Sequence, residues 1–355
     1  MRIKQIVFLD HHEKSVTGGH LYNDDFERYL EKISNFRFVF TPSCAKKYYG
    51  WRKIISPLAE LRWVKLFKKD TLLMFGDTSY KHHFLLALLN KWLIKSPSAM
   101  IVHHFPFVEQ RGLLWKVNKW FMCRYVTLID SIIVPSPFTL DVVKSIFSDK
   151  KIFYIPLPFA QIFNKSINYE QGNLLYVGTI EERKGLSYLI EALALLDNRD
   201  SIKLNIVGKI VDQSYYNILK QIIDARNLTS NINFLGRVSN EKLNECYQKA
   251  EIFTFPSLLE GYGIVLIEAF NNALPIICFD NTAMPYTVKD NVNGLVAKNK
   301  DIYDLAEKIK LLIGNKPLRE KLQEGIEKTI NNLKQKKDFE EGVEFFYEYV
   351  SNSYS

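Results

Sequence analysis

Residues 251–272, EIFTFPSLLEGYGIVLIEAFNN, decide the fold of this chain. The stretch begins as a short apolar strand, turns at Pro256 and Ser257, and is predicted to continue as a helix from about Gly263. Two carboxylates flank that junction, because Glu260 lies in the loop and Glu268 follows in the second turn of the helix. The order of strand, loop and helix indicates an α/β protein, and the two acids mark the loop for closer analysis.

The helix after this loop is predicted to be buried on almost every side, because eight of its residues are apolar: Ile264, Val265, Leu266, Ile267, Ala269, Phe270, Ala273 and Leu274. A buried carboxylate without a partner costs on the order of several kcal/mol, so we expect a polar group to meet Glu268. Gly261 and Gly263 allow the backbone to approach a ligand, and the helix start offers free N–H groups to an anion. The alternative is that Glu268 reaches water and the glycines only form a turn.

Residues 256–270, PSLLEGYGIVLIEAF, resemble the E-x7-E segment of retaining, GT-B-fold glycosyltransferases of family 4. The Pro-Ser pair, the Glu-Gly-x-Gly turn, the second Glu and the following Ala all fall in register. In that family the first Glu contacts the transferred sugar and the second binds the nucleotide ribose. The resemblance therefore implies these roles for Glu260 and Glu268, and places Gly261, Tyr262, Gly263 and Ile264 at the donor.

A second segment, residues 173–196, is predicted to form a strand that ends at Gly178 and a helix with one apolar face. Arg183 and Lys184 stand where this helix starts, and cations there oppose the helix dipole by roughly 0.3–1 kcal/mol each. A bound anion would explain their position, whereas a solvated basic turn is the alternative. The segment is similar to the family's Gly-Arg-…-Lys-Gly phosphate site, with Thr179 where many members have Arg and Arg183 as a substitute charge.

Two further turns of the second half bear on the donor. The resemblance implies that the backbone from Gly236 to Val238 holds the nucleotide base. Thr282-Ala283 and Tyr286 replace the family's usual Gly-Gly and Glu, which leaves the identity of the sugar open.

The first half alternates strand-like and helical patterns, with strands expected at 4–10, 36–41, 71–75, 99–103 and 131–135. Such alternation favours a parallel sheet covered on both faces, with ligands beyond the carboxyl ends of the strands. Gly18 and Gly19 follow the first strand; a simple turn is one interpretation, and the resemblance implies approach to the donor phosphates or the acceptor. His103 ends the strand 99–103 and is either a structural residue or, as the resemblance implies, the histidine that reaches the transferred sugar, with His104 where the family has Asp.

The length of 355 residues predicts two domains. We expect a Rossmann-like acceptor-binding domain at 1–157, a linker at 158–172, a Rossmann-like donor-binding domain at 173–335, and a C-terminal helix at 336–355 that returns to the first domain. The predicted fold class is α/β, with two doubly wound domains facing across a cleft, the GT-B arrangement.

Positive charge is concentrated in the first half: residues 1–160 hold 24 Lys and Arg against 13 Asp and Glu, and the rest hold 23 against 26. Two basic segments rich in Trp and Tyr, residues 48–69 and 113–126, are typical of helices at a membrane interface. Ordinary domain helices are the alternative, and no nucleic-acid motif is present, so we predict no nucleic-acid partner. Scattered cysteines and the lack of a signal peptide or a membrane span predict a cytoplasmic protein, either free or peripheral on the inner face of the plasma membrane.

These features predict a retaining glycosyltransferase that moves a sugar from a nucleotide-diphosphate sugar to a glycan or lipid-linked acceptor, in cell-envelope polysaccharide or lipopolysaccharide synthesis. Glu260, Lys184 and His103 are the candidate catalytic residues. The sequence has no Asp-x-Asp triplet, so we expect neither a metal nor another cofactor. The alternatives are a non-catalytic partner subunit that binds nucleotide-sugar, a sugar-binding receptor with two α/β domains, and a nucleotide-sugar epimerase.

Overall fold

The computed structural model describes residues 3–11, 18–42, 57–77, 80–105, 113–159 and 169–353. The chain divides into two compact units, one formed by Met1–Ala160 with Lys334–Ser355 and the other by Gln161–Leu333. Each unit contains a parallel sheet of six strands with helices packed on it, so the predicted α/β class is confirmed. The predicted linker lies largely outside the described residues, because its positions 160–168 are not among them.

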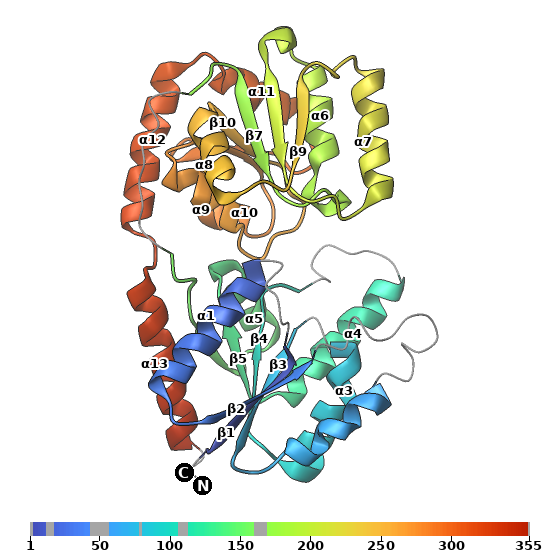
Figure 1. Cartoon of the computed structure of the whole chain (residues 1–355), viewed down its shortest axis with the longest axis vertical. Coiled ribbons are helices and arrows are strands. Elements are labelled where there is room, and N and C mark those ends of the chain that lie inside the picture. Colours follow the sequence, from blue (N-terminus) through green and yellow to red (C-terminus); the bar gives the residue numbers. More distant parts are fainter. Residues whose placement is uncertain are drawn as a thin grey trace. The chain divides into compact units, whose positions relative to one another are not determined.

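The first unit has the strand order β2-β1-β3-β4-β5-β6 (Figure 1). Its described elements are β1 Gln5–His11, α1 Gly18–Ile33, β2 Arg37–Pro42, η1 Leu61–Leu66, β3 Thr71–Gly76, α3 Tyr80–Leu89, η2 Asn90–Ile94, β4 Ser98–Ile101, α4 Leu113–Leu128, β5 Ser131–Val134, α5 Pro137–Ile146, β6 Lys151–Tyr154 and α13 Lys336–Ser353. The central strands β3, β4 and β5 are mostly apolar, since helices cover both faces of the sheet. In β3, for example, Leu72, Leu73, Met74 and Phe75 are all at most 2% exposed.

The C-terminal helix α13 belongs to this first unit, where it packs on α1 and β6. The ring centroids of Phe26 and Phe346 lie 5.8 Å apart, and the Tyr29 hydroxyl donates a 2.8 Å hydrogen bond to Glu344. Residues from the two ends of the sequence therefore share one hydrophobic core.

The second unit has the strand order β12-β11-β10-β7-β8-β9. Its described elements are β7 Asn173–Val177, η4 Glu182–Lys184, α6 Leu186–Ala194, η5 Arg199–Ser201, β8 Lys203–Val207, α7 Gln213–Ala225, β9 Ile232–Gly236, α8 Asn240–Lys249, β10 Ile252–Phe255, α9 Ile264–Asn271, β11 Ile276–Phe279, α10 Met284–Thr287, β12 Gly294–Ala297, α11 Ile302–Leu312 and α12 Lys316–Asn331. The apolar runs of the sequence locate these strands, and Ser239 caps α8 by accepting a hydrogen bond from the Lys242 N–H.

The strand order of this second sheet reverses between β7 and β10. From β7 the chain builds outward through β8 to β9, then returns to the middle and builds the other way through β10, β11 and β12. Right-handed crossovers place α6 and α7 on one face and α8 and α9 on the other, and Figure 1 shows the two layers. Ligands of open parallel sheets bind beyond the carboxyl ends of the strands at such a reversal, so this point positions the site.

Candidate functional site

Two loops meet at the carboxyl ends of β7 and β10. Residues 178–185 follow β7, and residues 256–263 follow β10. The Leu258 N–H donates a 2.7 Å hydrogen bond to the Arg183 carbonyl, which ties one loop to the other. Gly185 has φ +68°, and a Cβ there would lie 1.9 Å from the Pro256 carbonyl oxygen. The close approach of the two loops therefore requires glycine at this position.

We expect Gly185→Ala to destabilise the second unit more than Gly236→Ala does. Both glycines have φ near +68°, but a Cβ on Gly236 meets nothing within 4 Å. Left-handed strain alone costs roughly 1–2 kcal/mol, and Gly185→Ala adds a backbone clash that forces the loops apart. Urea unfolding of the two variants and the parent measures the difference, and equal losses of free energy of unfolding would contradict this account.

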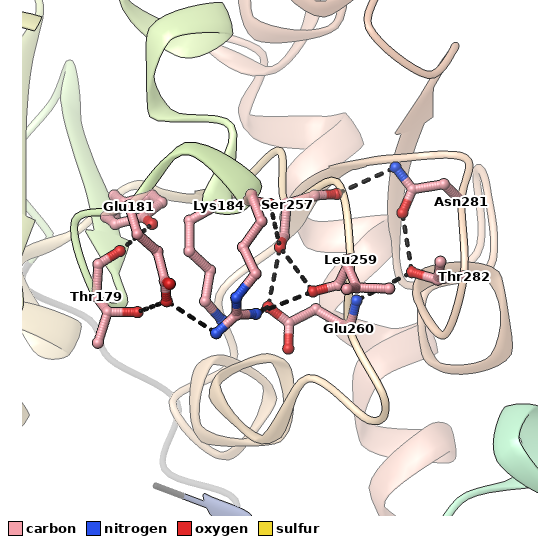
Figure 2. Close-up of polar contacts among 10 residues, drawn as sticks. Thr179, Glu181, Lys184, Ser257, Leu259, Glu260, Asn281 and Thr282 are labelled. Carbon is pink, nitrogen blue, oxygen red and sulfur yellow. Dashed lines mark hydrogen bonds and ion pairs between the residues drawn. The ribbon is translucent and has the colours of Figure 1, made fainter. Parts of the chain in front are cut away.

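Glu260 is held by cations and a hydroxyl from both loops (Figure 2). Its Oε1 pairs with the Lys184 ammonium group, accepts a 2.9 Å hydrogen bond from Ser257 Oγ, and lies 3.9 Å from Arg183 Nη1. The side chains of Lys184 and Glu260 are only 11% and 12% exposed, so water screens this pair weakly. Among the described residues these contacts all go to Oε1, which leaves Oε2 available to a ligand hydroxyl.

Thr282, which stands where the resembled family has glycine, orients the backbone of Glu260. The Glu260 N–H donates a 3.2 Å hydrogen bond to Thr282 Oγ1, and Thr282 in turn donates to Asn281. Asn281 Nδ2 in turn donates a 3.1 Å hydrogen bond to the Ser257 carbonyl, so the series of contacts returns to the loop of Glu260, as Figure 2 shows. Thr282 therefore positions the loop, a role that its sequence position did not reveal.

Thr179 and Arg183 are brought together by Glu181, which the sequence reasoning missed. Glu181 Oε1 accepts a 2.6 Å hydrogen bond from Thr179 Oγ1 and a 2.8 Å hydrogen bond from Arg183 Nη2. The other guanidinium nitrogen, Nη1, donates a 3.2 Å bond to the Leu259 carbonyl. The arginine thus bridges the two loops beside Glu260. The sequence does show an acid two residues before Arg183, but the spacing alone does not show whether its side chain points toward the arginine.

Six of the eight apolar residues named for this helix are buried as predicted, whereas Glu268 lies on a face of α9 that is partly exposed. Ile264, Val265 and Glu268 are partly exposed, because they share the one side of α9 that the unit leaves uncovered. The expected polar partner is present: Tyr247 on α8 donates a 2.8 Å hydrogen bond to Glu268 Oε2. Burial, followed by the Glu268 charge, raises the pKa of Tyr247 well above its ordinary value, so the phenol stays protonated and donates.

The remaining predicted donor residues of this unit line the same edge of the sheet. Gly178 directly follows β7 and donates a backbone hydrogen bond of 2.9 Å to Val207. Gly236 ends β9, and Val238 lies two residues further on and is partly exposed. The turn Gly261-Tyr262-Gly263 leads into Ile264, the first residue of α9.

The predicted residues of the first unit also gather at strand ends. Gly18 begins α1, and a Cβ on Gly19 would lie 3.3 Å from the His103 ring, so this glycine makes room for the histidine. His103 Nε2 shares a 2.9 Å hydrogen bond with Asn23 Oδ1. Burial lowers the pKa of His103, which keeps the imidazole neutral near pH 7.

A carboxylate beside His103 comes from the neighbouring strand. Asp77, directly after β3, accepts hydrogen bonds from the backbone N–H groups of His103 and His104, at 2.8 and 3.4 Å. His104 occupies the position where the resembled family has its Asp, and Asp77 places an acid near that turn. Sequence reasoning missed Asp77, because its contact depends on the pairing of β3 with β4.

In the described part of the chain, no group of three or more His, Cys, Asp or Glu residues has the geometry to hold a metal ion. None of the described helices is long and apolar enough to cross a membrane.

Known proteins that resemble this chain include curated glycosyltransferases. O-antigen chain mannosyltransferase B of Escherichia coli is 31% identical over 152 residues, which cover 42% of this chain and 39% of that protein. A Campylobacter jejuni enzyme is 26% identical over 93% of this chain and 87% of its own length; its name describes an α-1,4-N-acetyl-D-galactosaminyltransferase that acts on an undecaprenol-diphosphate-linked glycan.

Solved structures share the fold over nearly the whole chain. Sucrose-phosphate synthase from Thermosynechococcus elongatus superposes with a TM-score of 0.78, at 16% identity over 98% of this chain and 99% of that one. Anabaena HepE in complex with UDP and glucose gives 0.74, at 15% identity over 97% and 99%.

The profile of one protein family, described as "Glycosyl transferases group 1", matches residues 159–329. These residues contain the loops after β7 and β10 and the contacts of Glu260 and Glu268 described above. Through this region, just under half of its length, the chain resembles the glycosyl transferases group 1, a family of glycosyltransferases.

Proposed function

We propose that this protein is a retaining, metal-independent glycosyltransferase that moves a sugar from a nucleotide-diphosphate sugar to a glycan or lipid-linked acceptor. The observation that carries the proposal is the meeting of Lys184, Arg183 and Glu260 where the strand order reverses. Two cations and one carboxylate at that point suit a substrate with an anionic diphosphate next to a neutral sugar.

The chemistry follows from what each group does to the diphosphate and the sugar. Negative charge builds on the leaving phosphate as the glycosidic bond loosens, and fixed donors stabilise it best in a site that excludes water. Lys184, Arg183 and the backbone amides at the start of α9 supply such donors without a metal. Glu260 Oε2 accepts a hydrogen bond from a hydroxyl of the transferred sugar.

Retention fits a same-face route, in which the departing phosphate oxygen takes the proton of the attacking acceptor hydroxyl. Glu260 is no nucleophile in this scheme, because the acceptor hydroxyl itself attacks the anomeric carbon and no bond forms between the sugar and the protein. Glu268 binds the ribose, and the backbone at Gly236–Val238 holds the base. The family resemblance implies that Gly19 and His103 contact the sugar or the acceptor, and this role stays a prediction.

The names of two relatives support the acceptor class that we propose. The Escherichia coli relative is named for O-antigen chains and the Campylobacter jejuni relative for an undecaprenol-linked glycan. A lipid-linked or polymeric glycan of the cell envelope is therefore the acceptor we propose, with the protein in the cytoplasm at the inner face of the plasma membrane.

Incubation with mass-tagged nucleotide-sugars, with and without a membrane lipid extract, tests this function. A transferase releases free nucleotide only in the presence of an acceptor and moves the tag into the lipid or glycan fraction. Binding without turnover would favour a non-catalytic partner subunit, and a change of the sugar without any acceptor would favour an epimerase.

A basic, partly apolar surface of the first unit supports contact with an anionic membrane. The helices α3, η2 and α4 carry five Lys and Arg residues and no Asp or Glu. On them Trp92 and Leu93 are 71% and 73% exposed, and Val117 and Trp120 are 55% and 56% exposed. We call these four residues the apolar patch. Exposed Trp among Lys and Arg is typical of segments that enter a lipid interface.

The structure shows which aromatic residues of the two basic segments are buried. Tyr125 is fully buried in the core and Trp115 packs against it, which fits the alternative of an ordinary domain helix for these two residues. Phe121 is partly buried and contacts Phe84. Residues 48–56 of the other segment lie outside the described residues. Trp92, which belongs to neither segment, is the most exposed tryptophan in the described part of the chain.

We expect the protein to float with vesicles that contain phosphatidylglycerol at low salt, and the double variant Trp92→Ala/Trp120→Ala to bind them at least tenfold more weakly. Each buried CH₂ equivalent contributes about 0.8 kcal/mol, so the loss of two indoles exceeds that factor. Tyr303→Ala removes an aromatic residue of the second unit that is 69% exposed and serves as the control. Equal flotation of the double variant and the parent would refute the patch as the contact.

A further inference from the structure

We infer that Glu181 is a positioning residue for nucleotide binding: it holds the Arg183 guanidinium against the loop that carries Glu260. The inference rests on the proposed function, because the diphosphate is what Arg183 would meet. Neither the resemblance to the family nor the sequence pattern assigns a role to this acid.

The geometry gives Arg183 two anchors on two loops. Nη2 donates 2.8 Å to Glu181 Oε1, and Nη1 donates 3.2 Å to the Leu259 carbonyl. Thr179 Oγ1 donates 2.6 Å to the same Glu181 oxygen, which fixes the carboxylate before it binds the arginine. Arg183 is 44% exposed, so it has the freedom to swing into water without these anchors.

Glu181 places a negative charge beside the proposed diphosphate site, which is unfavourable for an anionic ligand unless the carboxylate holds the arginine. A carboxylate near a diphosphate site repels the ligand, and its side chain is only 24% exposed, so solvent screens it incompletely. A plain electrostatic account therefore predicts that removal of this acid tightens nucleotide binding. The positioning role predicts the opposite sign, because loss of Glu181 releases the cation that the ligand needs.

Glu182 offers a matched control. It lies in the same turn, carries the same charge, and its side chain is exposed. Glu182→Ala removes one negative charge at nearly the same place but leaves the Thr179–Glu181–Arg183 contacts intact. We expect Glu182→Ala to leave nucleotide affinity unchanged or slightly higher.

The experiment measures the Kd of UDP, GDP and ADP by calorimetry for the parent, Glu181→Ala, Glu181→Gln, Glu182→Ala, Arg183→Ala and the double variant Glu181→Ala/Arg183→Ala. For the diphosphate that the parent binds, we expect Glu181→Ala to raise Kd about tenfold, the effect of one lost coupling between adjacent charged groups. Glu181→Gln keeps an acceptor oxygen and should recover part of the affinity. The double variant should bind no more weakly than Arg183→Ala, because Glu181 acts only through that arginine.

The outcomes separate this inference from the function on which it rests. A parent that binds one of the diphosphates, with Glu181→Ala binding it equally well or more tightly, overturns the positioning role and leaves the function standing. A double variant clearly weaker than Arg183→Ala also overturns it. A parent that binds none of the three diphosphates overturns both. Melting temperatures without ligand identify a variant that has lost its fold, in which case Glu181→Gln and Glu182→Ala decide.

Discussion

Lys184→Ala should lower kcat about 100- to 1,000-fold, the usual effect of removing one fixed donor from a developing anion. The lysine is almost wholly buried and already directed to the loop after β10, where it pairs with Glu260. It therefore stabilises the leaving phosphate without having to move into place. The KM for the nucleotide-sugar should change much less, because the charge on the phosphate grows mainly in the transition state. Steady-state rates with saturating donor and acceptor measure the effect.

The variant also leaves Glu260 without its partner, which is a second route to a loss of activity. The double variant Lys184→Ala/Glu260→Gln separates the two causes, since it removes the lysine and the unpaired charge together. If the lysine only neutralises Glu260, the double variant should have the kcat of Glu260→Gln alone. If it stabilises the leaving phosphate, the double variant should be much slower than Glu260→Gln. Equal rates of the double variant and Glu260→Gln would remove Lys184 from the proposed catalytic residues.

Glu268→Ala should weaken binding of the nucleotide-sugar roughly 10- to 100-fold, the loss expected for hydrogen bonds to a charged acceptor. Its carboxylate is oriented by the Tyr247 hydroxyl on the partly exposed face of α9. Ribose hydroxyls donate to such a carboxylate, whereas a deoxyribose analogue makes fewer of these bonds. The variant should therefore also lose its preference for the ribonucleotide over the deoxyribonucleotide, and this second measurement is independent of overall stability.

Two further variants control this prediction. Tyr247→Phe keeps Glu268 and loses only the hydroxyl that orients it, so the increase in Kd should be smaller. Glu245→Ala removes an exposed acid from the same helix, α8, where its partners are Lys242 and Lys249. It should bind the donor as the parent does. Unchanged affinity and unchanged ribose preference in Glu268→Ala would rule out the ribose assignment.

The sequence predicted the order of strands and helices well because those elements depend on local patterns. Largely apolar runs such as 252–255 and 276–279 are strands that are buried on both faces of the sheet. The E-x7-E spacing placed Glu260 in a loop and Glu268 on a helix, as the structure has them. Such features require only knowledge of neighbours in the chain.

The contacts of the site depended on residues far apart in the chain, and these the sequence did not show. Lys184 and Glu260 meet because β7 pairs with β10, and Tyr247 meets Glu268 because α8 and α9 share one face of the sheet. Nothing in the sequence distinguishes Glu181 and Asp77 from ordinary surface acids, because their hydrogen-bond partners depend on the fold. The sequence also did not show that one side of α9 is partly exposed. The helix is largely apolar, but other elements of the unit cover only part of its surface.

The pairing of β7 with β10 has a consequence for the newly made chain. The lysine and the glutamate that pair with one another are synthesised 76 positions apart, and β8, β9 and β10 are made between them. A ribosome-bound chain that ends before β10 contains Lys184 and Arg183 but lacks Glu260 and Glu268. Nucleotide should therefore begin to protect the nascent protein from protease only after α9, which carries Glu268, has left the exit tunnel.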